Sequence, residues 1–205
     1  KGSEGGTGAA PPEFSNSVGT PLVEGIVLVD DLLRGAGLRD NVKIICSGKA
    51  CTCLLVTSGF GIVRNLALGA DLCNSARGMM FALGCIQALK CGTNHCPTGI
   101  ATQDPRLMSG LHVPSKKERV QRFQEKTVHA ATEIISAAGV SNTAGMLPSS
   151  MIKLRRDGVN SARYSDIFPP CQPRSLLEGT APDPLQAIWG AGQDMLGSSP
   201  PSAAK

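Results

Sequence analysis

The sequence predicts an α/β fold with a parallel β-sheet. Two short segments, residues 42–46 and 71–75, have the length expected of strands, and the first is rich in β-branched residues. Apolar residues at helical spacing fill the segments that come after them, residues 60–68 and 79–89. The order strand, helix, strand, helix at this spacing is typical of βαβ units, whose strands lie parallel.

A further helix is expected before the first strand. Thr20 is its predicted N-cap, and Pro21 takes the first helical position, where a missing N–H is tolerated. The glycines at 35 and 37 end it. Its broad apolar face consists of Ile26, Val27, Val29, Leu32 and Leu33.

The two helices of the βαβ units are expected to be largely buried. The helix at 60–68 ends at Gly69, and the helix at 79–89 leads into a cysteine-containing loop. The inward-facing residues of the first are predicted to be Ile62, Val63, Leu66 and Ala67.

The loops that follow the two strands are candidate phosphate sites, because loops at this edge of a parallel sheet carry the chemistry. Each combines small residues, free backbone amides and one cation, the groups that hold a phosphate. Taken singly, Lys49 or Arg77 is equally well explained as a solvated charge, but their parallel placement favours phosphate binding. The residues are Ser47, Gly48 and Lys49 in one loop and Asn74, Ser75, Ala76, Arg77 and Gly78 in the other.

The chain opens with a glycine-rich loop. Its backbone amides, left bare by small residues, suit an anion or a flat ring. It is not a nucleotide P-loop, since no Gly-Lys-Ser/Thr follows, and Pro11 and Pro12 prevent the helix of a dinucleotide fingerprint. A linker explains this composition equally well. The residues of interest are Gly5, Gly6, Thr7 and Gly8.

Three cysteines, Cys85, Cys91 and Cys96, are the most specific chemical signal in the chain. Their spacing is too irregular for one helix face, and Pro97 follows the last of them, as in iron–sulfur ligand runs. Three thiolates fit a cluster that lacks one iron. A zinc site needs a fourth ligand, for which His95 is available but poorly placed beside Cys96. Reduced packing or redox cysteines are the remaining interpretation.

Beyond the cysteines, residues 115–118 read as a capping box that starts a helix ending at Gly139. His129 in this helix is interpreted as a structural or surface histidine. From residue 148 onward the periodicity fades and prolines recur, so an irregular tail is expected, with disorder over about the last ten residues. The buried stripe of the helix is predicted to be Val120, Phe123, Val128, Ala131, Ile134 and Ile135.

Composition limits the function classes. The chain has 205 residues, enough for one core, and a net charge of +4 without a dense basic run, which argues against nucleic acid as a partner. With one Trp, one Tyr and five Phe it has few side chains for stacking bases.

No apolar stretch reaches membrane-span length, and the first residues do not show the pattern expected of a signal peptide. Its eight cysteines do not form a secreted disulfide framework, so a reducing cytoplasm is expected, or an organelle in a eukaryote. Because the first residue is Lys1, a fragment or processed product is expected.

The ordered combination of these motifs resembles glutamate synthase. The resemblance rests on the glycine loop at 4–11, on Gly69-Ala70-Asp71, and on the run from Met80 through the three cysteines to Asp104. More narrowly, these residues are similar to the FMN-binding synthase domain and to the shorter glutamate synthase-like flavoproteins built on it. The match covers about residues 2 to 140.

This resemblance implies a TIM-type (β/α)8 barrel that binds FMN and a 3Fe-4S cluster. It implies formation of L-glutamate from 2-oxoglutarate and glutamine-derived ammonia, with Cys85, Cys91 and Cys96 as cluster ligands. The two strand-following loops would then lie at the FMN phosphate, and residues 5–8 would border flavin and substrate. Expected partners are the remainder of the barrel, an amidotransferase domain or subunit, and an electron donor that the sequence does not identify.

The resemblance also defines the expected organisation. Residues 1–110 are the last βα units of the barrel with the cluster loop, residues 111–147 a C-terminal helix, and residues 148–205 the tail. Since the earlier strands are absent, the chain alone is expected to be inactive, and no catalytic residue is assigned. The alternative is a non-catalytic remnant with a cluster-binding or subunit-contact role. An apolar insertion at 50–55 stands next to the first phosphate loop, either an elaboration or a gene-modelling artefact.

Overall fold

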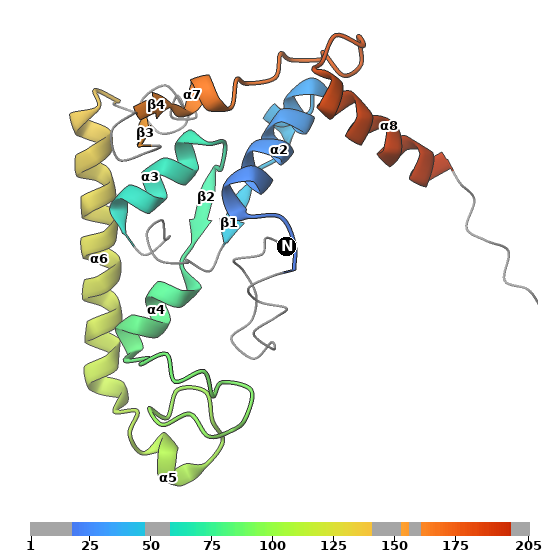
Figure 1. Ribbon diagram of the computed structural model, residues 1–205. Coiled ribbons are helices and arrows are strands. Elements are labelled where there is room, and N and C mark those ends of the chain that lie inside the picture. The colour runs from blue at the N-terminus through green and yellow to red at the C-terminus, as the bar shows by residue number, and fades with distance from the viewer. Residues whose placement is uncertain (1–17, 48–57, 141–152, 156–160, 198–205) are drawn as a thin grey trace, which may run out of the picture.

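Two parallel strands at the centre of the fold confirm the predicted βαβ order (Figure 1). The computed structural model describes residues 18–47, 58–140, 153–155 and 161–197. Strand β1 (Ile45–Ser47) pairs with β2 (Leu72–Asn74), and α3 (Gly59–Ala67) lies between them in the chain. Both strands are shorter than the sequence predicted, because each contributes three residues to the ladder. Closure of the sheet into a barrel stays a prediction.

The two faces of this sheet have different surroundings. Side chains alternate between the faces of a strand. Cys46 is 3% exposed and points into the core, whereas Ile45 and Leu72 on the other face are each 56% exposed. Parallel sheets are normally covered on both faces. In the described part of the chain only the face of the sheet that carries Cys46 is covered, which is consistent with a partial barrel domain.

Helix α2 (Leu22–Gly35) is present where the sequence predicted it, but it starts one residue late. Pro21 is the N-cap, and no side chain caps this end, so the predicted Thr20 cap was wrong. Ile26 is buried as expected, but Val29 is exposed. Instead, two carboxylates, Asp30 and Asp31, are buried on this helix because they have partners elsewhere in the fold.

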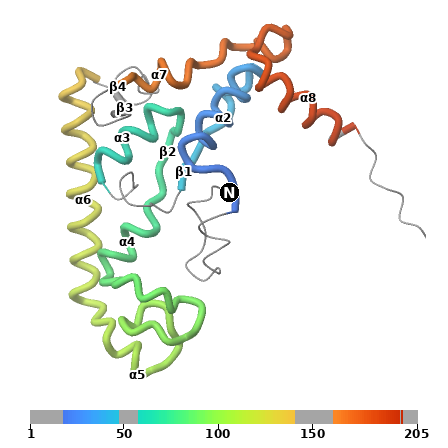
Figure 2. Tube along the Cα trace, viewed as in Figure 1, coloured from blue at the N-terminus to red at the C-terminus, as the bar shows by residue number. Residues whose placement is uncertain are grey.

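Helix α3 packs closely against the long helix α6 (Val113–Ala137), as Figures 1 and 2 show. The Ser58 hydroxyl caps α3 by accepting a hydrogen bond from the Gly61 amide at 3.1 Å. At Gly59, a Cβ would lie 2.5 Å from the backbone nitrogen of Ala131, so only glycine permits this approach. Val63 and Ala67 are buried and Ile62 and Leu66 partly buried, as predicted.

Helix α4 (Ala76–Leu83) is displaced toward the N-terminus from its predicted position at 79–89. Gly84 ends it in the left-handed conformation, with φ of 108°. The Gly84 and Cys85 amides donate to the Phe81 and Met80 carbonyls, each at 2.9 Å, which closes the last turn. Residues 85–89 are therefore loop, because glycine at 84 terminates the helix before the cysteine run begins.

Helix α6 confirms the predicted long helix but not its predicted start. Its N-cap is His112, and the Ser115 hydroxyl donates to the His112 carbonyl at 3.1 Å, so the capping box was wrong. Gly139, with φ of 76°, follows its end as expected. His129 lies on the surface, where its Nδ1 is 3.5 Å from Glu133 Oε2. Of the predicted stripe, Ala131 is buried, Val128 is exposed, and Val120, Phe123, Ile134 and Ile135 are partly buried.

The tail is more ordered than predicted. Strands β3 (Lys153–Arg155) and β4 (Ser161–Arg163) pair antiparallel, and α7 (Tyr164–Ile167) and α8 (Asp183–Gly197) follow. Tyr164 is buried in the same core cluster as Ile26. The prediction of an irregular tail was wrong for these elements. For α8 the reason is that Pro184 lies in its first turn, where proline is compatible with a helix. The segments 198–205 and 50–55 lie outside the described residues.

The segment before α8 is bonded to the end of α2. The Cys171 amide donates to Asp31 Oδ1 at 2.9 Å, and the Arg174 and Leu176 amides donate to the Arg34 and Gly35 carbonyls at 3.0 and 3.1 Å. Burial raises the pKa of Asp31, although the Cys171 hydrogen bond opposes the shift. The remaining elements are a short 3₁₀ helix, η1 (Arg39–Asn41), and α5 (Pro105–Met108).

Candidate cofactor and cluster site

The carboxyl ends of the two parallel strands bring two predicted site residues together. Ser47 and Asn74 are the last residues of β1 and β2, and they lie opposite each other in the register. Both are exposed. The rest of the first loop, Gly48 and Lys49, lies outside the described residues, as do Gly5, Gly6, Thr7 and Gly8. The pairing confirms only that both strands end at the same edge of the sheet.

The second predicted loop is the start of a helix. Residue Ser75 is the N-cap of α4, Ala76 and Arg77 occupy its first turn, and no side chain caps its amides. The Ser75 Oγ atom is inaccessible to solvent and has no hydrogen-bond partner among the described residues. First-turn amides without a side-chain cap carry partial positive charge. An orphaned hydroxyl beside them, with the cation of Arg77 two residues further along, fits a phosphate group.

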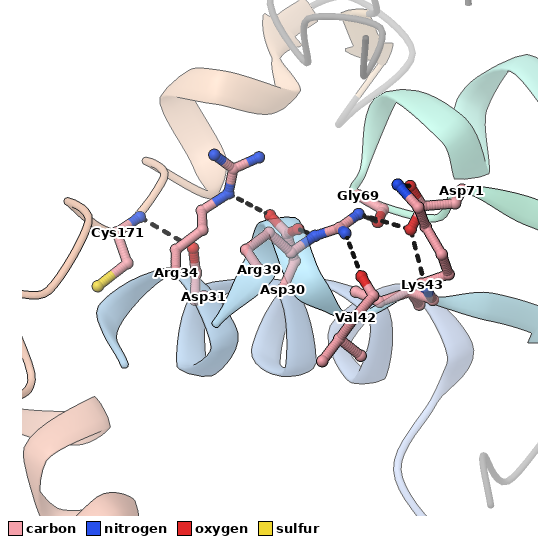
Figure 3. A network of polar contacts seen from close by, with 10 residues as sticks. Asp30, Asp31, Arg34, Arg39, Val42, Lys43, Gly69, Asp71 and Cys171 are labelled. Carbon is pink, nitrogen blue, oxygen red and sulfur yellow. Dashed lines mark hydrogen bonds and ion pairs between the residues drawn. The ribbon is translucent and has the colours of Figure 1, made fainter. Parts of the chain in front are cut away.

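The amino ends of the same strands are held by a buried ion network that sequence analysis missed (Figure 3). Arg39 Nε donates to Asp30 Oδ1 at 2.5 Å, and Arg34 Nε donates to Asp30 Oδ2 at 2.6 Å. Arg39 also donates to the Val42 and Gly69 carbonyls, both at 2.8 Å. One guanidinium thus connects α2 to the residues that precede β1 and β2.

Asp71 completes this network. Its Oδ2 accepts from Arg39 Nη2 at 2.9 Å and from the Ile44 amide at 2.8 Å. Burial alone would raise the pKa of Asp71, but the hydrogen bonds from Ile44 and Arg39 outweigh it and hold the pKa below its ordinary value. Asp71 is the last residue of the Gly69-Ala70-Asp71 motif, and its carboxylate joins the residue before β2 to Ile44, the residue before β1.

The three predicted cluster ligands lie on one loop between α4 and α5. Cys85 follows Gly84, the C-cap of α4, and is partly buried, as is Cys91, whereas Cys96 is buried. Among the described residues, which include all three cysteines and His95, no three His, Cys, Asp or Glu side chains are arranged to hold a metal ion. The structure therefore places the cysteines on a common loop but does not bring their sulfurs together.

This loop has unusual backbone geometry. Gln87, Leu89 and Asn94 adopt positive φ of 57°, 55° and 63° although none is glycine. Such conformations cost free energy and persist only where the surroundings impose them. The Asn94 side chain accepts from the Gln103 amide at 2.6 Å, and the Thr102 hydroxyl donates to the Asn94 carbonyl at 2.6 Å. The loop is thus braced by the segment that follows it.

The environment of Cys96 suits a thiolate. Its Sγ lies 3.4 Å from the Thr98 hydroxyl. The hydrogen bond from Thr98, helped by the amides of Ala101, Thr98 and Ile100 and opposed by burial, lowers the pKa of Cys96 to about 7. Hydrogen bonds to sulfur are also what tunes a thiolate that ligates iron. These hydrogen bonds suit Cys96 to the ligation of iron, whereas the described structure does not gather the three sulfurs around one point.

A second sulfur arrangement was not predicted. Cys46 Sγ lies 3.2 Å from Cys73 Sγ, because the two cysteines are register partners in β1 and β2. The sequence signal for this pair is one cysteine in each predicted strand segment, at the end of 42–46 and at the middle of 71–75. Spacing within one segment could not have revealed it, because the contact joins residues 27 positions apart.

Comparison with known proteins defines the class to which this fold and these loops belong. A family model described as the conserved region in glutamate synthase matches residues 1–141, more than half of the chain. The chain belongs to the glutamate synthase family. Members of this family are oxidoreductases of glutamate biosynthesis and generally use FMN and iron–sulfur clusters.

Individual relatives agree with this assignment. The glutamate synthase large subunit-like protein YerD of Bacillus subtilis is 41% identical over 157 residues, which are 77% of this chain and 29% of YerD. The archaeal glutamate synthase [NADPH] of Methanocaldococcus jannaschii is 36% identical over 159 residues, 78% of this chain and 30% of that protein. The glutamate synthase [NADH] of Saccharomyces cerevisiae is 30% identical over 182 residues, 88% and 8% respectively. The chain thus spans less than a third of these relatives.

None of the helices in the described part of the chain combines the length and apolar character needed to cross a membrane.

Proposed function

We propose that this chain contributes the FMN-phosphate and cluster-binding end of an oxidoreductase that forms L-glutamate from 2-oxoglutarate and glutamine-derived ammonia. The arrangement of α4 carries the proposal. Its N-cap Ser75 and its first turn with Arg77 supply the groups for a phosphate, and its last turn leads through Gly84 into Cys85. At about 1.5 Å per residue, its eight residues separate the two ends by roughly 12 Å.

The residues that would hold FMN are those at the sheet edge and the glycine loop. Asn74, Ser75 and Arg77 offer a hydroxyl, amides and a cation to the phosphate, together with Ser47, Gly48 and Lys49 of the first loop. Residues 5–8 would border the ring and the substrate. Arg77 and Lys49 offset the phosphate charge, while amides of the turn orient the phosphate without a flexible side chain.

The residues that would hold a 3Fe-4S cluster are Cys85, Cys91 and Cys96. When bound, FMN supplies hydride transfer and the cluster supplies one-electron steps. The protein's own contribution is to keep Cys96 as a thiolate through Thr98 and the neighbouring amides, and to hold the loop through Asn94 and Thr102. Partners of the whole protein would be further barrel strands, an amidotransferase domain or subunit and an electron donor.

Cysteine replacement in the intact gene product tests the ligand assignment. Combined Cys85→Ser, Cys91→Ser and Cys96→Ser replacement should abolish bound iron and the broad visible absorbance of anaerobically purified protein, while flavin peaks persist. Cys171→Ser is the matched control, since Cys171 is buried in another part of the fold, and it should leave iron unchanged. Iron content that survives the triple replacement would refute the assignment.

The same spectra separate this proposal from a remnant without catalysis. Flavin peaks with an iron–sulfur shoulder, together with glutamate formation, support the enzyme. The shoulder without flavin supports a cluster-binding remnant, and a colourless protein argues against both cofactors.

A further inference from the structure

Cys46 and Cys73 lie within bonding reach of each other, each one residue before a proposed phosphate-binding residue, Ser47 or Asn74. They are register partners on parallel strands, both are free thiols, and their sulfurs are 3.2 Å apart. Neighbouring strands are about 4.8 Å apart, within the range of about 4.4–6.8 Å between Cα atoms that disulfides accept. An S–S bond of about 2.05 Å requires the sulfurs to approach by about 1.1 Å.

We propose that Cys46 and Cys73 form a site of reversible oxidation, at which hydrogen peroxide converts the two thiols into a disulfide that joins β1 to β2. The proposal does not depend on FMN or on an iron–sulfur cluster.

The surroundings of the two sulfurs differ in a way that suits this chemistry. The hydrogen bond from Cys73 lowers the pKa of Cys46, and the Asn65 side chain and the charge of Arg64 act in the same direction, while burial opposes them. The same hydrogen bond raises the pKa of Cys73. Of the two sulfurs, Cys46 is therefore the one that gives up its proton more readily, while Cys73 keeps its proton. Thiolates, not thiols, react with peroxides.

Because the sulfurs of Cys46 and Cys73 have little contact with solvent, only a small oxidant can reach them. Cys46 is almost completely buried and Cys73 is partly buried. A protein or glutathione disulfide has no direct approach to a sulfur of that kind, because attack requires contact between the sulfurs. Hydrogen peroxide is close to water in size, so it can reach a sulfur that a protein or glutathione disulfide cannot contact.

The reaction balances with one peroxide per pair. The Cys46 thiolate attacks one peroxide oxygen, the O–O bond breaks, and hydroxide leaves, which gives the sulfenic acid at Cys46. The Cys73 sulfur then attacks the Cys46 sulfur, the S–S bond forms and the S–O bond breaks. The displaced oxygen leaves as water with the proton of Cys73. Two electrons pass from the two sulfurs to the peroxide.

Peptide mapping of the intact gene product tests the pairing. Trypsin places Cys46 in the peptide 44–49 and Cys73 in the peptide 65–77, and each of these peptides contains a single cysteine. After brief peroxide treatment and alkylation of the remaining thiols, the linked peptides 44–49 and 65–77 should exceed any other linked pair at least tenfold. Dithiothreitol should restore both free peptides.

Three variants make the result decisive. Cys46→Ala and Cys73→Ala should each abolish the linked species, and because both replacements are small, circular dichroism shows whether either unfolds. Cys171→Ser should leave the linked species unchanged. Two outcomes overturn the proposal: full alkylation of Cys46 and Cys73 in peroxide-treated protein of unaltered circular dichroism, or the same pairing preference in protein unfolded by urea.

Discussion

Arg39 donates to Asp30 at 2.5 Å, and each side chain is only 9% exposed. The Arg39 side chain also reaches Asp71 and the carbonyls of Val42 and Gly69, so it is the common partner of groups on three segments (Figure 3). Its hydrogen bonds with Asp30 and Asp71 raise the pKa of Arg39 against the effect of burial. The residues that precede both strands therefore share one cationic partner.

Replacement of Arg39 by alanine should destabilise the fold strongly. It leaves Asp30 buried with one fewer cationic partner and frees the Val42 and Gly69 carbonyls from their donor. Breaking a buried ion pair costs about 3–5 kcal/mol. The free energy of unfolding from urea titration should fall by that order. Arg122→Ala removes an exposed pair with Glu118 and should change it by less than about 1 kcal/mol. Equal effects of both variants would show that the network contributes little.

Gly69→Ala should lower the stability of the folded protein more than Gly139→Ala does. Gly69 has φ of 120°, and a Cβ there would lie 2.7 Å from the Asp30 carboxyl carbon. Gly139 also has positive φ, of 76°, but a Cβ there meets nothing within 4 Å. Gly139→Ala should therefore cost only the left-handed penalty of roughly 1–2 kcal/mol, and Gly69→Ala more, as judged by thermal unfolding. The reverse order would contradict the packing of Asp30 against Gly69.

Asp71 should contribute acid sensitivity. Because its pKa is lower in the folded protein than in the unfolded chain, the unfolded chain binds its proton first as pH falls. The stabilisation is present above the ordinary aspartate pKa of about 3.9 and is lost as pH falls through the lower, folded value. Urea midpoints measured from pH 7 to pH 3 should fall less in Asp71→Asn than in the parent.

The control is Asp40→Asn, which removes an exposed carboxylate nearby and should show the same fall of the urea midpoint as the parent. If the midpoint of Asp40→Asn fell as little as that of Asp71→Asn, the effect would come from net charge and not from the Asp71 hydrogen bonds.

The spacing of apolar residues along the sequence predicted those helices and strands whose buried side chains recur at helix or strand intervals. The βαβ order, α3 and the length of α6 follow from apolar spacing and from glycines such as Gly69 and Gly139. The helix starts were less predictable, because caps at Pro21 and His112 depend on backbone geometry, not on side-chain type. The elements after residue 148 were missed, since Tyr164 is buried by contact with residues far away in the chain.

The candidate site was predictable only where its chemistry is local. The cysteine run and the two strand-following loops are readable because their residues are close together in sequence. The Arg39 network and the Cys46–Cys73 contact join segments about thirty residues apart. No composition or spacing rule connects such residues until the strand register is known.

FMN retention should distinguish a phosphate-binding role of Arg77 from a structural one. If Arg77 neutralises the FMN phosphate, Arg77→Ala removes a charge-assisted hydrogen bond of about 1.5–3 kcal/mol, equivalent to roughly tenfold to hundredfold weaker binding. Flavin fluorescence released on dilution of the intact gene product measures this, and iron content should stay unchanged. Lys49→Ala is expected to act likewise, while Arg122→Ala on the surface of α6 should retain FMN. Parallel loss of iron and FMN in Arg77→Ala would instead assign Arg77 to the packing of α4, because that helix leads into the cysteine loop.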